Sequence, residues 1–235
     1  MPNNYFNFKQ FVINQDKSAF KVGTDGVLLG AYADISGMKR ILDIGTGTGL
    51  IALMLAQRSS AEIVALEPDH DSFLQACENV SSSAWKERIK VFETTLQEYT
   101  DNLRFDLIVT NPPWFADSIK NPDPRKSSAR HNDSLPPDVL LSNVSQLLTE
   151  GGRFQLIMPY AEGNILIAEA AGYGFYCHDI LKIRPLPFSE IRRLIITFGR
   201  ERIRAKEKFL TIEQGKRHEF TEEYISLTNE FYLSF

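Results

Sequence analysis

The chain has 235 residues, of which 43% are hydrophobic and 24% are charged, and its formal net charge is −4. This composition predicts a globular protein with a substantial core, and the acidic balance argues against a protein that coats nucleic acid non-specifically. No run of 18 apolar residues and no signal-peptide pattern occurs, so we expect neither a membrane span nor export. Cys77 and Cys177 show no metal-ligand spacing, which predicts reduced cysteines, a cytoplasmic protein and no bound metal.

Strand-like and helix-like segments alternate along most of the chain. Short apolar runs that end at glycine, proline or an acidic residue predict strands, and amphipathic runs predict helices. Strands are predicted at residues 40–45, 62–67, 89–94, 105–110, 152–159, 175–184 and 192–199. Helices are predicted at residues 49–59, 70–83, 136–151 and 161–172, and Gly151 and Gly152 would close the third. A short helix near the C-terminus would have Thr221 as its N-cap.

This alternation predicts the α/β class, with a seven-stranded, mostly parallel sheet and helices on both faces. The last two predicted strands are joined by the loop PLPFSE, which indicates an antiparallel edge on the parallel sheet. We expect a single domain over residues 1–235, with a short N-terminal extension at residues 1–38.

The segment LDIGTGTGL, at residues 42–50, leaves the first predicted strand and enters a helix. Gly45, Gly47 and Gly49 carry no Cβ, so the backbone can turn tightly and approach a ligand closely. In an open parallel sheet, ligands bind at the carboxyl ends of the strands, at the switch point of the strand order. Three glycines also occur in purely structural turns, so this pattern alone is weak evidence for a ligand site.

An acidic residue narrows the choice of ligand. The second predicted strand ends in Glu67, about twenty residues beyond the glycine loop, and Pro68 leads into the next helix. A carboxylate in this place accepts the ribose hydroxyls of a nucleoside in nicotinamide enzymes and in S-adenosylmethionine enzymes alike. Asp43 favours the second class, because its carboxylate would repel a pyrophosphate and suits the ammonium of a methionine group. The predicted cofactor is S-adenosylmethionine.

The segment FDLIVTNPPWF, at residues 105–115, ends a predicted strand in an amide, two prolines and a tryptophan. Such dipeptides are common in turns, but here they would lie beside the donor. The side-chain carbonyl of Asn111 and the backbone carbonyl of Pro112 can both accept hydrogen bonds from an exocyclic amino group. Pro112 and Pro113 stiffen this frame, and Trp114 offers a flat face for a planar base. These four residues are the predicted catalytic group.

Taken together, DIGTGTG, Glu67 and NPPW resemble the class I, Rossmann-like methyltransferases. The stretch FKQFVINQDKSAFKVGTDGVLLGAYA is more particular and resembles the bacterial tRNA1(Val) adenine-N6-methyltransferases, which modify the adenine beside the anticodon at tRNA position 37. In that family KVGTDGxLLG borders the donor pocket, which implies donor-site roles for Lys21, Thr24 and Asp25. Thr24 and Asp25 also form an N-cap pattern.

The resemblance implies S-adenosylmethionine-dependent N6-methylation of an adenine in tRNA, with tRNA as partner and a monomeric enzyme. The wider class usually has an aspartate after the third strand, which contacts the donor's adenine; Thr95 and Leu96 stand there in this chain. The expected donor site therefore comprises Lys21, Thr24, Asp25, Asp43, Gly45, Thr46, Gly47, Gly49, Glu67, Pro68, Thr95, Leu96 and Asn111.

The expected RNA-binding residues lie in two basic stretches. SSARH, at residues 127–131, resembles the family's substrate stretch and implies Arg130 and His131. Residues 182–208 contain nine Lys or Arg against three Glu, among them Arg192 and Arg193. Phosphate neutralisation dominates nucleic-acid affinity, so this segment favours RNA over a protein substrate, although a solvated face would look the same.

Other functions remain compatible with these motifs. Enzymes that methylate a glutamine amide in proteins, and DNA adenine methyltransferases, use the same Asn-Pro-Pro chemistry. The first usually have tyrosine in place of Trp114 and a separate N-terminal helical domain, and the second usually carry an inserted recognition domain. A non-catalytic protein that binds the donor and holds RNA is a further alternative.

Overall fold

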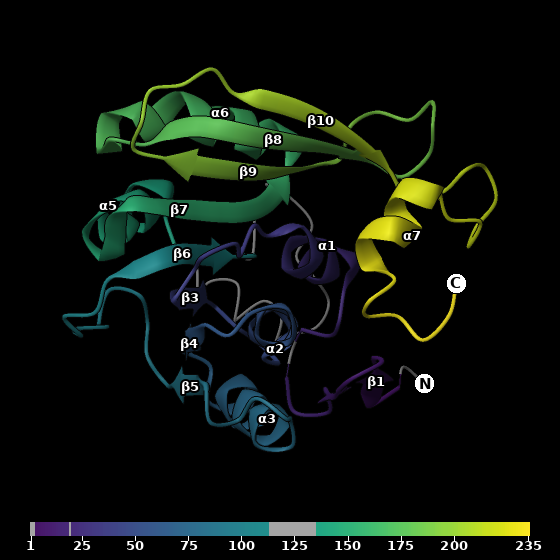
Figure 1. Cartoon of the computed structure of the whole chain (residues 1–235), viewed down its shortest axis with the longest axis horizontal. Coiled ribbons are helices and arrows are strands. Elements are labelled where there is room, and N and C mark those ends of the chain that lie inside the picture. Colours follow the sequence, from purple (N-terminus) through teal and green to yellow (C-terminus); the bar gives the residue numbers. More distant parts are fainter. Residues whose placement is uncertain (1–2, 19, 113–134) are drawn as a thin grey trace.

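The computed structural model describes residues 3–18, 20–112 and 135–235 (Figure 1). Within these ranges the main sheet has eight strands, and a separate antiparallel pair lies near the N-terminus. The order across the main sheet is β10 (Lys206–Thr211), β8 (Tyr176–Arg184), β9 (Arg193–Gly199), β7 (Leu148–Pro159), β6 (Phe105–Thr110), β3 (Arg40–Ile44), β4 (Glu62–Leu66) and β5 (Ile89–Phe92). The small pair is β1 (Tyr5–Asn7) and β2 (Val12–Asn14).

The predicted fold class is confirmed, with one more strand than expected in the main sheet. Among its described strands only β9 runs against the others, because it pairs antiparallel with both β7 and β8. It lies inside the sheet rather than at its edge. The edge strand is β10, which pairs parallel with β8 and was not predicted. Its charged, alternating sequence KEKFLT has a single buried residue, Leu210, so it lacks the apolar run that marks the other strands.

Helices cover both faces of the sheet (Figure 1). Residues alternate between the faces along each strand: Ile41 packs in the core cluster under α1 and α2, and Leu42 packs in the cluster under α5 and α6. The helices are α1 (Thr24–Tyr32), α2 (Leu50–Arg58), α3 (His70–Ser81), α5 (Pro137–Leu147), α6 (Tyr160–Ala170), the 3-10 turn η1 (Ala171–Tyr173) and α7 (Glu222–Thr228).

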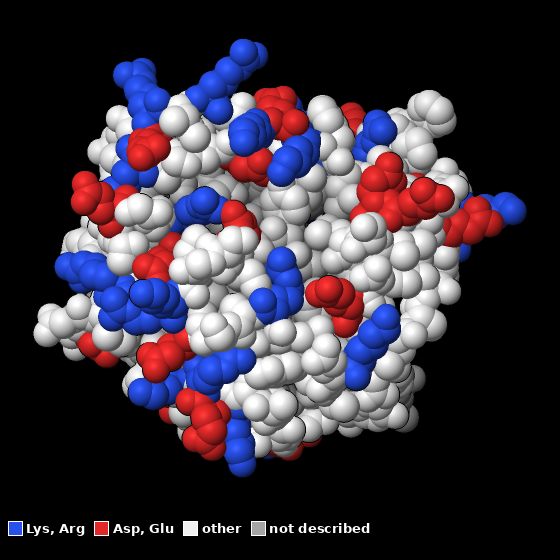
Figure 2. All heavy atoms as spheres, in the orientation of Figure 1, with Lys and Arg blue, Asp and Glu red and all other residues white. Residues whose placement is uncertain are grey.

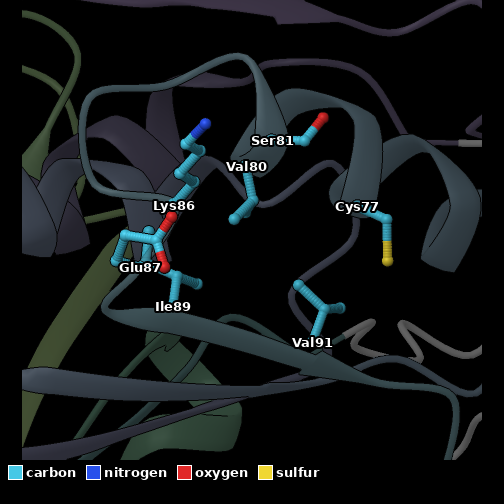
Figure 3. A pocket seen from close by; sticks show the side chains of 7 residues that line it. All are labelled: Cys77, Val80, Ser81, Lys86, Glu87, Ile89 and Val91. Carbon is cyan, nitrogen blue, oxygen red and sulfur yellow. The ribbon is translucent and has the colours of Figure 1, made fainter.

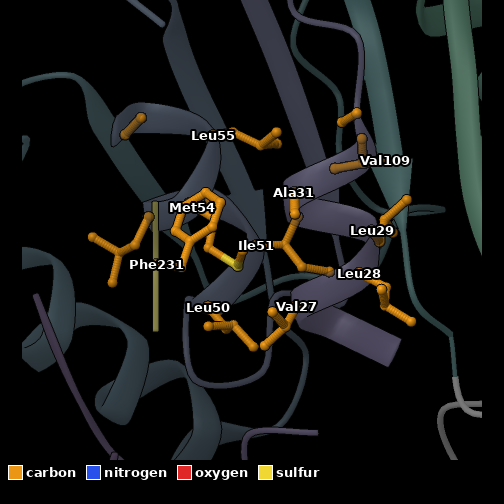
Figure 4. Close-up of a cluster of buried hydrophobic side chains, with 14 of the residues drawn as sticks. Val27, Leu28, Leu29, Ala31, Leu50, Ile51, Met54, Leu55, Val109 and Phe231 are labelled. Carbon is orange, nitrogen blue, oxygen red and sulfur yellow. The ribbon is translucent and has the colours of Figure 1, made fainter. Parts of the chain in front are cut away.

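The first helix, α1, packs closely on α2 (Figure 4). A Cβ added at Gly30 would lie 2.7 Å from Sδ of Met54, so the absence of a side chain at residue 30 allows this approach. Phe231, from the C-terminal segment, is also buried in this cluster. The N-terminal extension is therefore fixed to the core of the fold through α1.

Two predicted helix ends can be compared with the structure. Thr221 is the N-cap of α7, and its hydroxyl accepts a hydrogen bond from the backbone N–H of Tyr224, as expected. The prediction that Gly151 and Gly152 close the third long helix is wrong. That helix, α5, ends at Leu147, and Leu148 is already extended and pairs with Phe105 of β6, so both glycines lie within β7.

The strand order creates a switch point beside β3. The chain passes from β3 to β4 and β5 on one side, then returns to β6 on the other side of β3. Both β4 and β6 run parallel to β3, so their carboxyl ends meet at one edge. This edge, called here the carboxyl edge, is where an open parallel sheet binds ligands.

Candidate active site

The glycine loop after β3 is held in a conformation that requires glycine. Gly45, Gly47 and Gly49 have φ values of 69°, 57° and 82°, which side chains rarely adopt. The backbone N–H groups of Gly45 and Thr46 both donate to the carbonyl of Leu66, at distances of 2.9 and 3.0 Å. Among the described residues, a Cβ at Gly45 or Gly47 would meet nothing within 4 Å, so this part of the chain leaves space beside the loop at the carboxyl edge.

Asp43 lies beneath the glycine loop and is completely buried. Its Oδ2 accepts a hydrogen bond from the hydroxyl of Thr46 at 2.6 Å, so Thr46 orients the carboxylate. Its Oδ1 has no hydrogen bond of normal geometry within the part of the chain that the structure describes. Burial raises the pKa of Asp43 to about 6, although Thr46 and the backbone N–H of Ala52 both act to lower it. A cationic ligand would relieve this buried charge.

Glu67 fixes the other side of the glycine loop. Its Oε2 accepts a hydrogen bond from the backbone N–H of Gly47 at 2.7 Å, and Oε1 accepts one from Asp69 N–H at 3.0 Å. Pro68 lies between Glu67 and Asp69 in the chain. The side chain of Asp69 caps α3 by accepting a hydrogen bond from the N–H of Ser72. The predicted turn from strand to helix is confirmed, and the carboxylate lies at the loop.

A buried polar stripe on α3 was missed by the sequence reasoning. Ser72, Gln75 and Asn79 are all buried, and each contacts the N-terminal segment. Asn79 also donates to the carbonyl of Thr48 in the glycine loop at 2.8 Å and to the carbonyl of Asn14 at 2.9 Å. Their helical spacing resembles an ordinary solvent-facing side, which is why the stripe gave no signal.

Asn111 follows the last residue of β6 and lies next to the glycine loop in the strand order. The hydroxyl of Thr110 donates to the carbonyl of Ile44 at 2.9 Å, which ties the ends of β6 and β3 together. A Cβ added at Gly26 of α1 would lie 3.9 Å from Nδ2 of Asn111. The structure therefore brings Asn111, the glycine loop and the beginning of α1 to one place.

The beginning of α1 is held by an ion pair rather than by a side-chain cap. Gly23 is the N-cap and makes no side-chain hydrogen bond, so the prediction that Thr24 and Asp25 cap this helix is wrong. Oδ2 of Asp25 instead accepts from Nε of Arg193 at 2.8 Å. An expected donor residue and an expected RNA-binding residue are thus paired with each other. Lys21 donates to the carbonyl of Asn3 at 3.3 Å.

Two further expected donor residues follow β5. The hydroxyl of Thr95 accepts a hydrogen bond from the backbone N–H of Glu98 and donates one to the Glu98 carboxylate at 3.0 Å. Thr95 therefore stabilises a local turn. Leu96 is buried in the core cluster on the α5 side of the sheet. Pro112 is described and follows Asn111 directly. Four expected site residues lie outside the described residues: Pro113, Trp114, Arg130 and His131.

The basic segment 182–208 is divided between opposite edges of the sheet. Arg193 begins β9 at the carboxyl edge, where it pairs with Pro159 and Ile183. Arg202 lies at the other end of β9, with its guanidinium 5.8 Å from the ring centre of Tyr176. A seven-residue strand is roughly 20 Å long, so these arginines belong to separate surfaces.

Several of the remaining cations are neutralised. Lys182 pairs with Glu207 at 2.7 Å and Lys208 pairs with Asp179 at 3.3 Å. Figure 2 shows basic and acidic side chains interspersed over one face of the molecule. The segment is therefore not a continuous basic patch.

One pocket of about 260 Å³ lies away from these residues, between α3, the following loop and β5 (Figure 3). It is lined by Cys77, Val80, Ser81, Lys86, Glu87, Ile89 and Val91, none of which was predicted to be in the site. The described ranges contain no group of three His, Cys, Asp or Glu residues arranged to hold a metal ion. They also contain no helix long and apolar enough to cross a membrane.

Comparisons with known proteins agree on a class of enzyme. The family described as the methyltransferase small domain matches residues 22–158. The tRNA1(Val) (adenine(37)-N6)-methyltransferase of Bacteroides thetaiotaomicron is 48% identical over 236 residues, which cover 99% of each chain. The enzyme of the same name from Trichodesmium erythraeum is 43% identical over 240 residues, with both chains fully covered.

Among solved structures, a protein from Agrobacterium tumefaciens described as a predicted O-methyltransferase superposes with a TM-score of 0.69. It covers 88% of this chain and 96% of its own, at 23% identity, and so supports the fold alone.

Proposed function

The chain belongs to the tRNA1(Val) (adenine(37)-N6)-methyltransferase family, and on that premise we propose that it methylates N6 of adenine 37 in tRNA1(Val) with S-adenosylmethionine as the donor. One observation carries the proposal. Asn111 is held beside the glycine loop by the hydrogen bond from Thr110 to Ile44, so an acceptor for an amino group adjoins a loop built for a nucleoside. The protein is proposed to act as a cytoplasmic monomer.

The residues of the glycine loop fit the proposed donor. S-adenosylmethionine, when bound, supplies a methyl group on a positively charged sulfur. The buried Oδ1 of Asp43, which has no hydrogen-bond partner among the described residues, would accept from the donor's ammonium, and this cation would stabilise the carboxylate. Gly45 and Gly47 leave room for the ligand to approach the backbone. Glu67 is held at the loop by two N–H groups, and its carboxylate would accept hydrogen bonds from the ribose hydroxyls.

Asn111 and Pro112 would orient the acceptor amine. The lone pair of an adenine amino group is delocalised into the ring, which makes the nitrogen a poor nucleophile. Two acceptors, the side-chain carbonyl of Asn111 and the backbone carbonyl of Pro112, would bind its two hydrogens and direct the lone pair toward the methyl group. No general base is required, because the methylated amine loses its proton to water. Rate enhancement would come mainly from alignment of nitrogen, carbon and sulfur.

The remaining expected residues complete the proposal. Pro113 would stiffen the frame and Trp114 would support the flipped base, while Arg130 and His131 would contact the RNA backbone. Arg192 is exposed at the carboxyl edge and is proposed to contact phosphate. The RNA path would include Arg193. The donor site would include the remaining expected residues, which are Lys21, Thr24, Asp25, Thr95 and Leu96.

The test is methyl transfer from labelled S-adenosylmethionine to bulk tRNA that lacks modification, followed by nucleoside analysis. We expect label in N6-methyladenosine, and mapping of tRNA1(Val) fragments should locate it at position 37. Measurable donor binding without label in tRNA would refute the proposal and would direct attention to a glutamine-bearing protein.

A further inference from the structure

The loop between β8 and β9, residues 185–192, carries a phenylalanine that nothing in the described chain covers. Phe188 is 102% exposed, the highest value among the large hydrophobic residues of the described chain. A fully exposed ring gives up the free energy that burial of its roughly 150–250 Å² would contribute, and the turn that presents it and the charges beside it indicate its role.

Hydrogen bonds hold this loop in a fixed turn. The Ser189 hydroxyl accepts from the N–H of Leu186 at 3.0 Å and donates to the carbonyl of Leu186 at 2.8 Å. The N–H of Ser189 also donates to that carbonyl at 3.1 Å. Pro185 and Pro187 restrict the backbone on either side of Leu186. The ring of Phe188 is thus presented by a rigid turn, which reduces the ordering cost of any contact it makes.

The turn rises from the carboxyl edge, the same edge as Asn111. Its base is fixed there, because the N–H of Arg192 donates to the carbonyl of Ile183 at 2.8 Å and the N–H of Tyr160 donates to the carbonyl of Arg192 at 3.2 Å. The beginning of β9 lies two strands from β6, which is about 10 Å across the sheet. Along the strand direction, Thr110 of β6 pairs with Leu156 of β7 and Arg193 of β9 pairs with Pro159, so the two points are three residues, again about 10 Å, apart. A single-stranded loop of RNA spans this separation with a few nucleotides.

The charges around the turn suit RNA. The side chain of Arg192 is 66% exposed, and its contact with Glu190 is long, at 3.9 Å between nitrogen and oxygen. Arg193, at the base of the turn, is already paired with Asp25 at 2.8 Å, so Arg192 is the cation of the turn that a phosphate would meet first. Glu190 is itself 85% exposed, so a bound phosphate at Arg192 would displace a weak partner rather than a buried one.

The small apolar area argues against a second copy of this chain as the partner. A stable protein interface needs roughly 800 Å² per partner, whereas one aromatic ring supplies about 150–250 Å². An exposed ring beside an exposed, weakly paired arginine is instead an arrangement that suits an unpaired base, because the base stacks on the ring and the arginine contacts its phosphate.

We propose that Phe188 is a stacking platform for an unpaired base of the tRNA anticodon loop, close to the adenine that enters at Asn111. This inference rests on the proposed function. It adds a residue that binds the tRNA without contacting the reacting atoms. Phe188 therefore governs the KM for tRNA, while the rate at saturating tRNA depends on the residues around Asn111.

The experiment compares Phe188→Ala, Phe188→Leu and Phe188→Trp with the wild-type enzyme in steady-state methyl transfer to tRNA1(Val) transcript. Phe188→Ala and Phe188→Leu should each raise the KM for tRNA about tenfold, with kcat and the KM for S-adenosylmethionine unchanged. Phe188→Trp should retain the wild-type KM, because it keeps a planar ring. A leucine variant as good as the tryptophan variant would overturn the proposal, since simple apolar contact would then suffice.

Phe209 provides the matched control. It is also an exposed phenylalanine, on β10, and lies under the ammonium of Lys182 at 5.6 Å. Phe209→Ala should leave the KM for tRNA within twofold, and an equal rise in both variants would refute a specific role for Phe188. Sedimentation gives a second readout: a wild-type dimer that Phe188→Ala converts to a monomer would identify another copy of the chain as the partner.

If the wild-type enzyme transfers no methyl group to tRNA, the proposed function fails, and direct tRNA binding still decides the role of Phe188. Equal tRNA affinity of wild type and Phe188→Ala would then refute the stacking platform, and a loss confined to Phe188→Ala and Phe188→Leu would support it.

Discussion

Asp25 and Arg193 are 168 residues apart in the chain, yet they form an ion pair at 2.8 Å across the carboxyl edge of the sheet. The pair joins the first turn of α1 to the beginning of β9, and Gly26, next to Asp25, lies against Asn111. Both side chains are about one-third exposed, so the pair contributes little to global stability. We therefore expect its main effect to be on the position of α1 beside the candidate site.

A charge swap tests this positioning role. Arg193→Asp should lower kcat/KM for tRNA about tenfold, while changing the free energy of unfolding by less than about 1 kcal/mol. The double variant Asp25→Arg, Arg193→Asp should recover part of the activity, because the attraction is restored with the charges exchanged. If Arg193 instead contacts RNA phosphate directly, the double variant will remain as weak as Arg193→Asp, and steady-state kinetics will separate the two cases.

Removal of the Asn111 amide should greatly reduce kcat but leave the affinity for the methyl donor nearly unchanged. Asn111→Ala is expected to lower kcat by at least about 100-fold, because the acceptor amine loses one of its two fixed acceptors. Donor affinity, measured by calorimetry, should stay within a few-fold. Asn143 on α5 supplies a control, since its amide only donates to a helix carbonyl at 2.8 Å, and Asn143→Ala should be fully active. Equal loss of turnover and donor binding in Asn111→Ala would contradict the assigned role.

Glu67 should matter for the donor rather than for tRNA. Glu67→Ala removes the acceptor of the Gly47 N–H bond, so the glycine loop loses one of its constraints and the donor loses its proposed ribose partner. Hydrogen bonds to charged groups are worth about 1.5–3 kcal/mol, which corresponds to at least a tenfold rise in the donor Kd. Glu62, exposed at the beginning of the same strand, is the matched control. A donor Kd unchanged in Glu67→Ala would remove this residue from the site.

The raised pKa of Asp43 predicts two effects of pH. Its value of about 6 lies above the ordinary 3.8, a difference worth roughly 3 kcal/mol. Because the folded state holds this proton more tightly, the contribution to stability is complete below about pH 4 and is lost as the pH rises toward 6. Donor affinity should move in the opposite direction and fall below about pH 6, since the ammonium prefers the ionised carboxylate.

Denaturant titrations of wild type and Asp43→Asn between pH 4 and pH 7 check the first effect. The wild-type free energy of unfolding should decrease across that interval relative to that of the variant. The other carboxyl groups are the same in both proteins, so their contributions cancel in this difference. Parallel slopes for the two proteins would show that the carboxyl group does not titrate there.

Charge reversal at opposite edges tests which arginines face RNA. Arg192→Glu should weaken tRNA binding and reduce the slope of log affinity against log salt concentration by about 1. Arg204, which follows Arg202 beyond the far end of β9, should tolerate reversal without change. If both variants weaken binding equally, tRNA covers more of the molecule than the carboxyl edge.

Much of the fold was predictable because each parallel strand has its own local pattern. The apolar runs at 40–44, 62–66 and 105–110 are buried on both faces, so composition alone identifies them. The strand β10 was missed because most of its side chains face solvent. The end of α5 was placed too late because pairing of Leu148 with Phe105 overrides the helical pattern that continues to Thr149.

For the candidate site, the sequence predicted that several residues would meet at one edge of the sheet, but it did not predict their contacts. Gly45, Gly47, Glu67 and Asn111 carry recognisable patterns, and the structure brings them to one edge. The pairing of Asp25 with Arg193 depends on where β9 begins, which no local pattern encodes. The role of Asn79 depends on two segments that approach it from 65 and 31 residues away.

The bonds of Asn79 also set an order for assembly during synthesis. Asn14 leaves the ribosome well before α3 exists, because a chain is made from its N-terminus at about 5–20 residues per second. Until residue 79 emerges, β2 has its partner β1 but the backbone of Asn14 lacks its partner on α3, and the glycine loop lacks the amide that binds the carbonyl of Thr48. In a nascent chain that ends before α3, Asn79 would therefore fix neither the segment around Asn14 nor the glycine loop, although both have already been made.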